Sequence, residues 1–143
     1  MRVIFAVGLL FSCLAPTSFA SSPNSSPLGM ERTYAQNYRD MVLATCIANA
    51  YKGDKNTAID AGSSVSALRE WAYYDFEKST DAVRALIDKY LARDYTNPLA
   101  ESEVKGVKFD LLKCLDLYHS KELNSLVKEV VIKPGHTYIQ DNK

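Results

Sequence analysis

The three cysteines of this chain constrain its fold more than any other feature. Cys13 lies in an apolar N-terminal run, whereas Cys46 and Cys114 lie at matching positions in two predicted helices. The two helical patterns are Leu43-x-x-Cys46-Ile47-x-x-Ala50 and Leu111-x-x-Cys114-Leu115-x-x-Tyr118. In each pattern the cysteine belongs to the apolar stripe, so both thiols should be buried between helices.

The first twenty residues have the pattern of a secretory signal peptide. Arg2 supplies the positive charge, an almost entirely apolar run follows, and Ser18-Phe19-Ala20 offers small residues for cleavage. The apolar run is too short to span a bilayer core, which needs about 20 such residues. A lipoprotein attached through Cys13 is an alternative, because Leu10-Phe11-Ser12-Cys13 loosely resembles a lipid-attachment box in which Phe11 fits poorly. We therefore expect an exported domain with no membrane insertion after signal cleavage.

Export favours a disulfide bond between Cys46 and Cys114. Two cysteines in a small domain tend to pair in an oxidising compartment. The bond would close a loop of nearly seventy residues, and the chain-entropy model assigns such a loop about 4 kcal/mol of stabilisation. Against a total stability of about 5–15 kcal/mol, this is a large share.

Helical periodicity dominates the mature chain, and no segment predicts a convincing strand. Thr33 can cap a first helix that runs to about Tyr51, a second helix is expected over 56–76, and a third begins at Thr80-Asp81. A fourth begins near Val107, and Ser120 either caps a further helix or lies within a continuous one. The mature chain has about 120 residues, which suits one domain. We expect an all-α fold, a compact bundle of about four to six helices with one buried disulfide. The expected boundaries are a signal peptide over 1–20, a flexible leader over 21–32, a helical domain over 33–132 and a tail over 133–143.

The composition leaves little room for catalysis or cofactor binding. The only histidines are His119 and His136, and His119 follows Cys114 by five helical residues, so the two side chains diverge. A cysteine hydrolase, which needs a thiolate beside a positioned base, is therefore disfavoured. No cluster of zinc ligands and no glycine-rich phosphate loop is present in the sequence. We expect no catalytic residue, no metal and no cofactor.

The charge balance argues against a nucleic-acid partner. The chain carries 17 basic and 17 acidic residues, and signal cleavage removes only Arg2 from them, which leaves a formal net charge of −1. A basic surplus that could contact phosphates is absent.

Two segments are candidates for contact with a partner protein. Residues 94–106 interrupt the helical periodicity, contain three acids and carry the turn signals Asn97-Pro98 and Gly106. Long connections are often functional, although a solvated linker would give the same pattern. Residues 71–76 hold four aromatic side chains that cannot all face one side of a helix. Core packing explains these aromatics equally well, but Trp71, Tyr73 and Tyr74 remain a second contact candidate.

The segments around the two paired cysteines resemble a known family. They are Tyr38-Arg39-Asp40-Met41-Val42-Leu43-Ala44-Thr45-Cys46-Ile47-Ala48-Asn49-Ala50-Tyr51 and Lys113-Cys114-Leu115-Asp116-Leu117-Tyr118-His119-Ser120-Lys121-Glu122-Leu123. Together with the signal peptide, they resemble the type VI secretion amidase immunity proteins that neutralise the fourth family of amidase effectors. The resemblance extends from about Tyr34 to Val131.

The resemblance implies a periplasmic, non-enzymatic inhibitor. Such proteins bind an amidase effector that cleaves the peptide stems of peptidoglycan, and they thereby protect the producer and its siblings. The resemblance also implies an all-helical homodimer that holds two effectors as a heterotetramer, with a protruding loop that blocks the cysteine–histidine centre of the amidase. Only residues 94–106 suit this loop in the present sequence. We therefore assign effector binding to Tyr95, Asn97, Leu99, Glu101, Ser102 and Glu103.

A protein of another class would also be small, helical, exported and stabilised by one disulfide. This alternative is a periplasmic acid-stress chaperone, which would bind many unfolded proteins at low pH. The near-neutral mixed charge and the long loop over 94–106 argue mildly against it.

Overall fold

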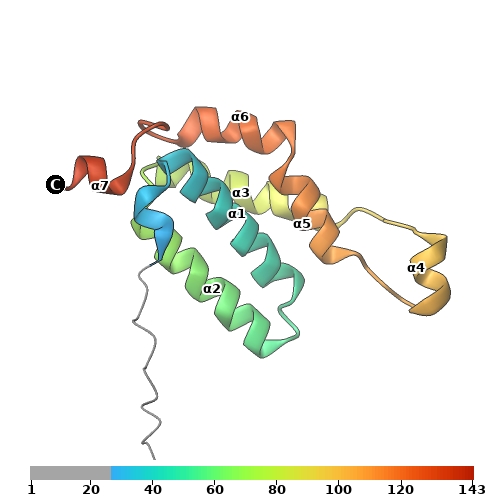
Figure 1. Cartoon of the computed structure of the whole chain (residues 1–143). Coiled ribbons are helices and arrows are strands. Elements are labelled where there is room, and N and C mark those ends of the chain that lie inside the picture. Colours follow the sequence, from blue (N-terminus) through green and yellow to red (C-terminus); the bar gives the residue numbers. More distant parts are fainter. Residues whose placement is uncertain (1–26) are drawn as a thin grey trace, which may run out of the picture.

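Seven α-helices and one short 3-10 helix make up the part of the chain that the computed structural model describes, residues 27–143 (Figure 1). The elements are η1 (Leu28–Glu31), α1 (Tyr34–Ala50), α2 (Lys55–Glu70), α3 (Phe76–Leu91), α4 (Pro98–Glu103), α5 (Asp110–Tyr118), α6 (Lys121–Val130) and α7 (Tyr138–Asp141). The all-α prediction is confirmed, and two of the seven helices, α4 and α7, are only six and four residues long. The expected signal peptide, Cys13 and the beginning of the expected leader lie outside the described residues. Across residues 27–143, each helix falls short of the length or the apolar character that crossing a membrane requires.

Side-chain caps fix where the helices of the bundle begin. The Thr33 hydroxyl accepts a hydrogen bond from the Gln36 N–H (3.2 Å), and the Gln36 side chain accepts one from the Thr33 N–H (2.9 Å). This reciprocal capping box confirms the predicted start of α1. Asp54 caps α2, and Ser120 caps α6 by accepting from the Leu123 N–H. The Ser120 cap shows that α5 and α6 are separate helices.

The junction between the second and third helices differs from the prediction. The sequence predicted a helix to Phe76 and another from Thr80, whereas α2 ends at Glu70 and α3 begins at Phe76. Asp75 caps α3, and its own N–H donates to the Val130 carbonyl (2.8 Å). The Ile132 N–H similarly donates to the Tyr73 carbonyl (2.8 Å). The backbone before α3 therefore leaves the helical conformation because it pairs with the segment that follows α6.

The disulfide bond lies in the core, where it joins α1 to α5. Cys46 and Cys114 are bonded and both are fully buried, which confirms the predicted pairing. The core around them is built by fully buried side chains from α1, α3, α5 and α6, namely Tyr38, Val42, Ile87, Leu117, Leu123 and Val130. Burial of each large apolar side chain contributes about 1.5–3 kcal/mol. The bridge thus reinforces a contact that apolar packing already favours.

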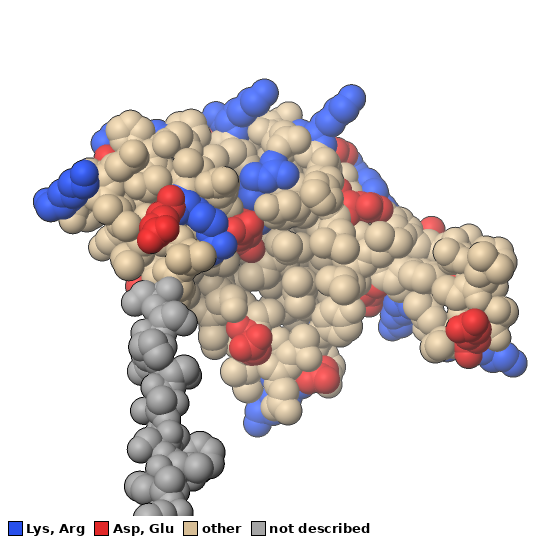
Figure 2. Space-filling model, in the orientation of Figure 1, with Lys and Arg blue, Asp and Glu red and all other residues tan. Residues whose placement is uncertain are grey.

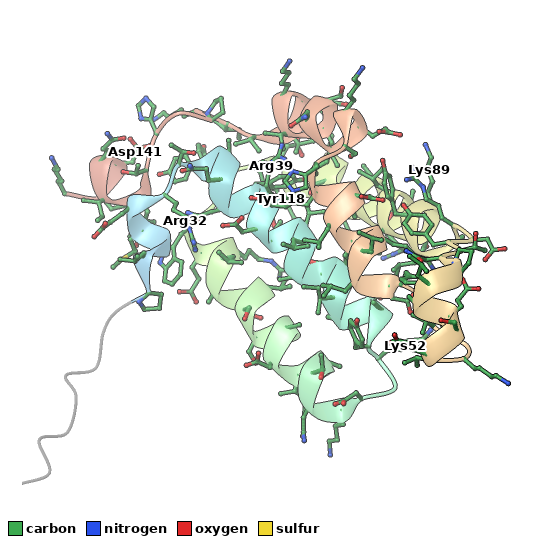
Figure 3. The ribbon with its side chains drawn as sticks, turned by 45° about the vertical axis from the view of Figure 1, so that its right-hand side comes forward. Arg32, Arg39, Lys52, Lys89, Tyr118 and Asp141 are labelled. Atoms are coloured by element: carbon green, nitrogen blue, oxygen red, sulfur yellow. A yellow bond between two sulfur atoms is a disulfide. The ribbon has the colours of Figure 1, made fainter. Side chains whose placement is uncertain are left out.

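Polar contacts add to the joint between α1 and the end of α5. The Arg39 guanidinium lies 4.9 Å from the centre of the Tyr118 ring (Figure 3). It also donates to the Tyr118 carbonyl and to the side-chain oxygen of Asn124. The Tyr118 hydroxyl in turn donates to the Asp40 carboxylate (3.1 Å). These contacts fix how α5 and α6 are oriented along α1.

Part of the expected leader is packed on the bundle. Gly29 of η1 is buried against the ring of Trp71, where an added Cβ would come within 2.1 Å of a ring carbon. The fully buried Asn37 amide donates to the Gly29 carbonyl (2.7 Å) and to the Trp71 carbonyl (2.8 Å). These two bonds satisfy a buried amide and fix residues 28–31 in place.

The expected tail over 133–143 also contacts the start of α1. The Tyr34 N–H donates to the His136 carbonyl (2.8 Å), and the Tyr34 hydroxyl donates to the Asp141 carboxylate (3.3 Å). The His136 ring lies 2.9 Å from the same carboxylate, and this hydrogen bond holds the pKa of Asp141 below its usual value. Tyr138, in the same segment, packs against the core.

Removal of the disulfide should destabilise the domain without changing its fold. We expect the double variant Cys46→Ala, Cys114→Ala to lose about 4 kcal/mol of unfolding free energy, because its unfolded chain is no longer restrained. Urea denaturation followed by circular dichroism measures the difference. A reductant should destabilise the wild type and leave the double variant unaffected. Equal unfolding midpoints for the oxidised wild type and the variant would contradict this expectation.

Candidate functional site

The segment between α3 and α5 leaves the bundle as an arm, residues 94–106, which carries α4 at its far end. In Figure 1, α4 lies apart from the other helices, at the end of the molecule opposite the C-terminus. Figure 2 shows the same segment as a lobe that stands out from the body of the protein. The arm coincides with the irregular stretch that the sequence singled out, and its helical turn begins at Pro98.

Polar contacts within the arm give α4 a defined shape. The Asn97 side chain accepts a hydrogen bond from the Leu99 N–H (3.1 Å), while the Glu101 carboxylate accepts from the Asn97 N–H (2.8 Å). Pro98 occupies the first helical position, where a missing N–H leaves no bond unmade. The Ser102 hydroxyl donates to the Leu99 carbonyl (2.7 Å). The arm is therefore shaped by its own caps rather than by contacts with the bundle.

Tyr95 attaches the base of the arm to the bundle. Its hydroxyl donates to the Asp116 carboxylate of α5 (2.5 Å) and accepts from the Arg93 guanidinium (3.3 Å). The latter hydrogen bond raises the pKa of Arg93. Tyr95 therefore anchors the base of the arm, to α5 on one side and to the end of α3 on the other.

Lys113, a buried lysine near the base of the arm, was not predicted from the sequence. Lys113 on α5 donates to the Leu91 carbonyl at the end of α3 (3.2 Å) and to the Asp110 carboxylate (3.0 Å). Its side chain is nearly inaccessible, so the Asp110 charge is needed to compensate it. The i, i+3 spacing of Asp110 and Lys113 can be seen in the sequence, but ion pairs at this spacing are usually solvated and do not indicate a buried lysine. Lys113 joins the two helices between which the arm begins and ends.

The six residues predicted to bind an effector all lie in this arm but have different roles in it. Tyr95, Asn97, Glu101 and Ser102 make the internal contacts that hold it in shape. Leu99 is 83% exposed. Glu103 is exposed too, and its carboxylate makes no hydrogen bond or ion pair within residues 27–143. Of the six predicted residues, Leu99 and Glu103 are therefore the ones whose side chains remain available for a partner.

The aromatic segment lies away from the arm and is partly core. Tyr74 packs edge to face on the buried Tyr38, with ring centres 5.0 Å apart. Trp71 covers η1, which Figure 1 places at the opposite end of the molecule from α4. Tyr73 packs on Tyr34 at 6.0 Å but remains 49% exposed. The structure therefore does not join these three residues to the arm, and only Tyr73 presents a large accessible surface.

An exposed leucine face on α5 was not predicted. The sequence pattern placed Leu111 and Leu115 in the buried stripe with Cys114, but they are 47% and 38% exposed, and Leu112 is 46% exposed. The bundle instead covers the side of α5 that carries Cys114 and Leu117. We call Leu111, Leu112 and Leu115 the leucine face. It borders a hollow of about 410 Å³ whose lining includes Tyr51, Val107 and Phe109.

The two cysteines and one histidine of the described residues are each paired with another side chain. Both cysteines of residues 27–143 are bonded to each other. Nowhere in this range do three potential metal ligands come together, and the His136 ring is paired with Asp141. The arm and the leucine face are the prominent exposed features next to α5.

Comparisons with known proteins agree with this description. A family model, Tai4, described as type VI secretion system (T6SS) amidase immunity protein, matches residues 36–127. A solved chain from work on new type VI-secreted toxins and self-resistance proteins in Serratia marcescens is 30% identical, with a TM-score of 0.73. That match covers 87% of this chain and 98% of the Serratia chain. A chain in the structure of the Tae4/Tai4 effector–immunity system from Salmonella typhimurium is 25% identical, with a TM-score of 0.62, covering 73% of this chain and 95% of that one. Among curated proteins, none matches.

The cap on α4 can be tested with Asn97→Ala. Loss of an N-cap costs about 1 kcal/mol, and a helix as short as α4 has little stability of its own. We expect the backbone amides of Leu99 and Ala100 to exchange faster with deuterium, while the melting temperature of the bundle stays the same. Asn56→Ala, at an exposed asparagine in the first turn of α2, is the matched control. Unchanged exchange in α4 of Asn97→Ala would contradict the capping role.

Proposed function

The chain belongs to the family of type VI secretion amidase immunity proteins, and from this membership we propose that it is a periplasmic inhibitor of one amidase effector. The effector would be a hydrolase of peptidoglycan peptide stems, and binding it would protect the producing cell and its siblings. The chain itself would have no enzymatic activity. In support, the disulfide occupies both thiols of residues 27–143, which are the strongest nucleophiles available there.

Two observations support a periplasmic location. The first twenty residues have the charge, apolar run and small residues of a cleaved signal peptide. The buried Cys46–Cys114 bond is typical of proteins that mature in an oxidising compartment.

The proposed mechanism of inhibition is based on the protruding arm. The side chains of Asn97 and Glu101 cap the start of α4. The arm is therefore ordered before it meets a partner, which lowers the entropic cost of binding. Leu99 would provide the apolar anchor that enters the amidase cleft. A cysteine–histidine centre made for a peptide offers hydrogen-bond donors, which the Glu103 carboxylate would satisfy. Glu101 suits this role less well, because its carboxylate already accepts from the Asn97 backbone.

We further propose that the inhibitor is a homodimer that binds two effectors as a heterotetramer. The family resemblance supports this stoichiometry. Tyr73, with half of its surface exposed beside Trp71 and Tyr74, is a second candidate for effector contact.

Inhibition should depend on the exposed side chains of the arm. We expect Glu103→Lys and Leu99→Asp each to weaken inhibition about 10-fold or more, because each removes a contact inside the amidase cleft. The free energy of unfolding should not change, since both side chains are exposed. The measurement is the inhibition constant for the amidase of the same type VI secretion cluster, assayed on a peptidoglycan stem peptide. Asp60→Lys, with the same charge change on the exposed side of α2, is the control.

A variant without the arm separates the proposed mechanism from its alternatives. Replacement of residues 94–106 by a short Gly-Ser linker should abolish inhibition while circular dichroism shows an intact bundle. Full inhibition by this folded variant would rule out occlusion by the arm. Absence of any binding between the wild type and the amidase, together with suppression of aggregation of unrelated unfolded proteins at low pH, would instead favour the chaperone.

A further inference from the structure

We propose that Lys113, the buried lysine near the base of the arm, is a positioning residue that fixes the direction in which the arm leaves the bundle. This role rests on the inhibition proposed above, and it belongs to a residue that would not touch the amidase. Lys113 is an almost inaccessible cation that lies between the two points at which the arm begins and ends.

The Lys113 ammonium contacts both sides of the base of the arm. It donates to the Leu91 carbonyl (3.2 Å), where the chain leaves α3, and to the Asp110 carboxylate (3.0 Å), where the chain returns to α5. It also lies 6.0 Å from the centre of the Tyr95 ring in the outgoing part of the arm, at the outer limit of a cation–π interaction. An ammonium has three N–H donors, and here it has three contacts on three segments of the chain. Lys113 therefore fixes these segments relative to one another.

The returning part of the arm contains a strained turn that Lys113 holds. Gly106 and Phe109 have φ of 75° and 54°. For a bulky residue such as Phe109 this conformation costs energy, and it persists only where the surroundings determine it. The Phe109 carbonyl accepts a hydrogen bond from the Lys113 N–H (3.0 Å), and the next residue, Asp110, pairs with the Lys113 ammonium. Lys113 thus holds the turn through both its backbone and its side chain.

Stability alone does not account for a lysine at this position. The Lys113 side chain is 7% exposed and that of Asp110 is 22% exposed. Removing two charges from water costs about as much as their attraction returns, so apolar residues of similar size are often equally stabilising. Apolar packing is non-directional, however, whereas bonds from an ammonium to a carbonyl and to a carboxylate have a defined geometry. Lys113 therefore contributes direction more than stability.

Direction matters because the arm is long and thin at its base. Residues 93–97 form no helix between α3 and α4, and five extended residues span up to about 16 Å. A rotation of about 10° at the base would move α4 by about 3 Å over such a span, whereas a binding site has to be held within about 0.5 Å. The caps within α4 give it its shape but do not set its direction relative to the bundle. The contacts at the base have to do so.

The first experiment measures the direction of the arm without any amidase. Residual dipolar couplings of the backbone amides of α4 and α1 are recorded on the exported chain, in which the Cys46–Cys114 bond has formed. Lys113→Met keeps the length of the side chain and removes its charge, whereas Lys113→Arg keeps the charge. We expect the α4 couplings to decrease in Lys113→Met and to be largely retained in Lys113→Arg, with those of α1 unchanged in both. Unchanged α4 couplings in Lys113→Met would overturn the proposal.

Arg39→Met is the control that separates loss of direction from loss of stability. It removes the polar contacts at the other end of α5, where Arg39 meets Tyr118. We expect its melting temperature to fall at least as much as that of Lys113→Met, while its α4 couplings stay as in the wild type. Equal loss of α4 couplings in both variants would overturn the proposal. If Lys113→Met does not fold, the double variant Lys113→Met, Asp110→Asn takes its place, because it leaves neither charge unpaired.

The second experiment measures the affinity for the amidase by calorimetric titration. We expect Lys113→Met to weaken binding about 10-fold and Lys113→Arg to recover most of this loss. When Lys113→Met is combined with Leu99→Asp, the total loss should be smaller than the product of the two single losses, because the two residues act through the same arm. Losses that multiply would overturn the proposal, since Lys113 would then act on another contact.

Failure of the positioning role can be told from failure of the proposed inhibition. A wild type that does not bind the amidase would contradict the inhibition, and the α4 couplings would still decide whether Lys113 directs the arm. A wild type that binds the amidase no better than Lys113→Met, although that variant has lost its α4 couplings, would leave the inhibition standing and overturn the positioning role.

Discussion

The buried bond between Cys46 and Cys114 fixes α5 to the first helix, and the exposed features of the molecule depend on α5. Apolar packing around the bridge and the contacts of Arg39 with Tyr118 hold the same two helices together. The bond contributes mainly by restraining the unfolded chain, so it stabilises the joint without requiring any special shape at the surface. The outer side of α5 is thereby free to carry residues that serve contact rather than stability.

The arm gains its rigidity from this anchored helix. Lys113 and Asp116 both project from α5, one holding the end of α3 through the Leu91 carbonyl and the other holding Tyr95. Beyond Tyr95 the arm depends only on its own caps. A segment that stands out in solvent keeps its shape only if it is held locally, and the arm achieves this with a capped helical turn on a base fixed by hydrogen bonds. The core in this way also holds the base of the arm in place.

Local features of the sequence predicted the fold well, and long-range pairings explain where they did not. The helix starts at Thr33 and Ser120 could be predicted, because a capping side chain bonds to a backbone N–H within three residues of itself. The break before α3 could not be predicted from the sequence, because it depends on the hydrogen bond from the Asp75 N–H to the distant Val130 carbonyl. The leucine face was missed because periodicity identifies a stripe around Cys114 but not which flank of it the neighbouring helices cover. For the arm, the break in helical periodicity was enough to locate the segment. Which of its side chains shape it and which are exposed became clear only from the hydrogen bonds.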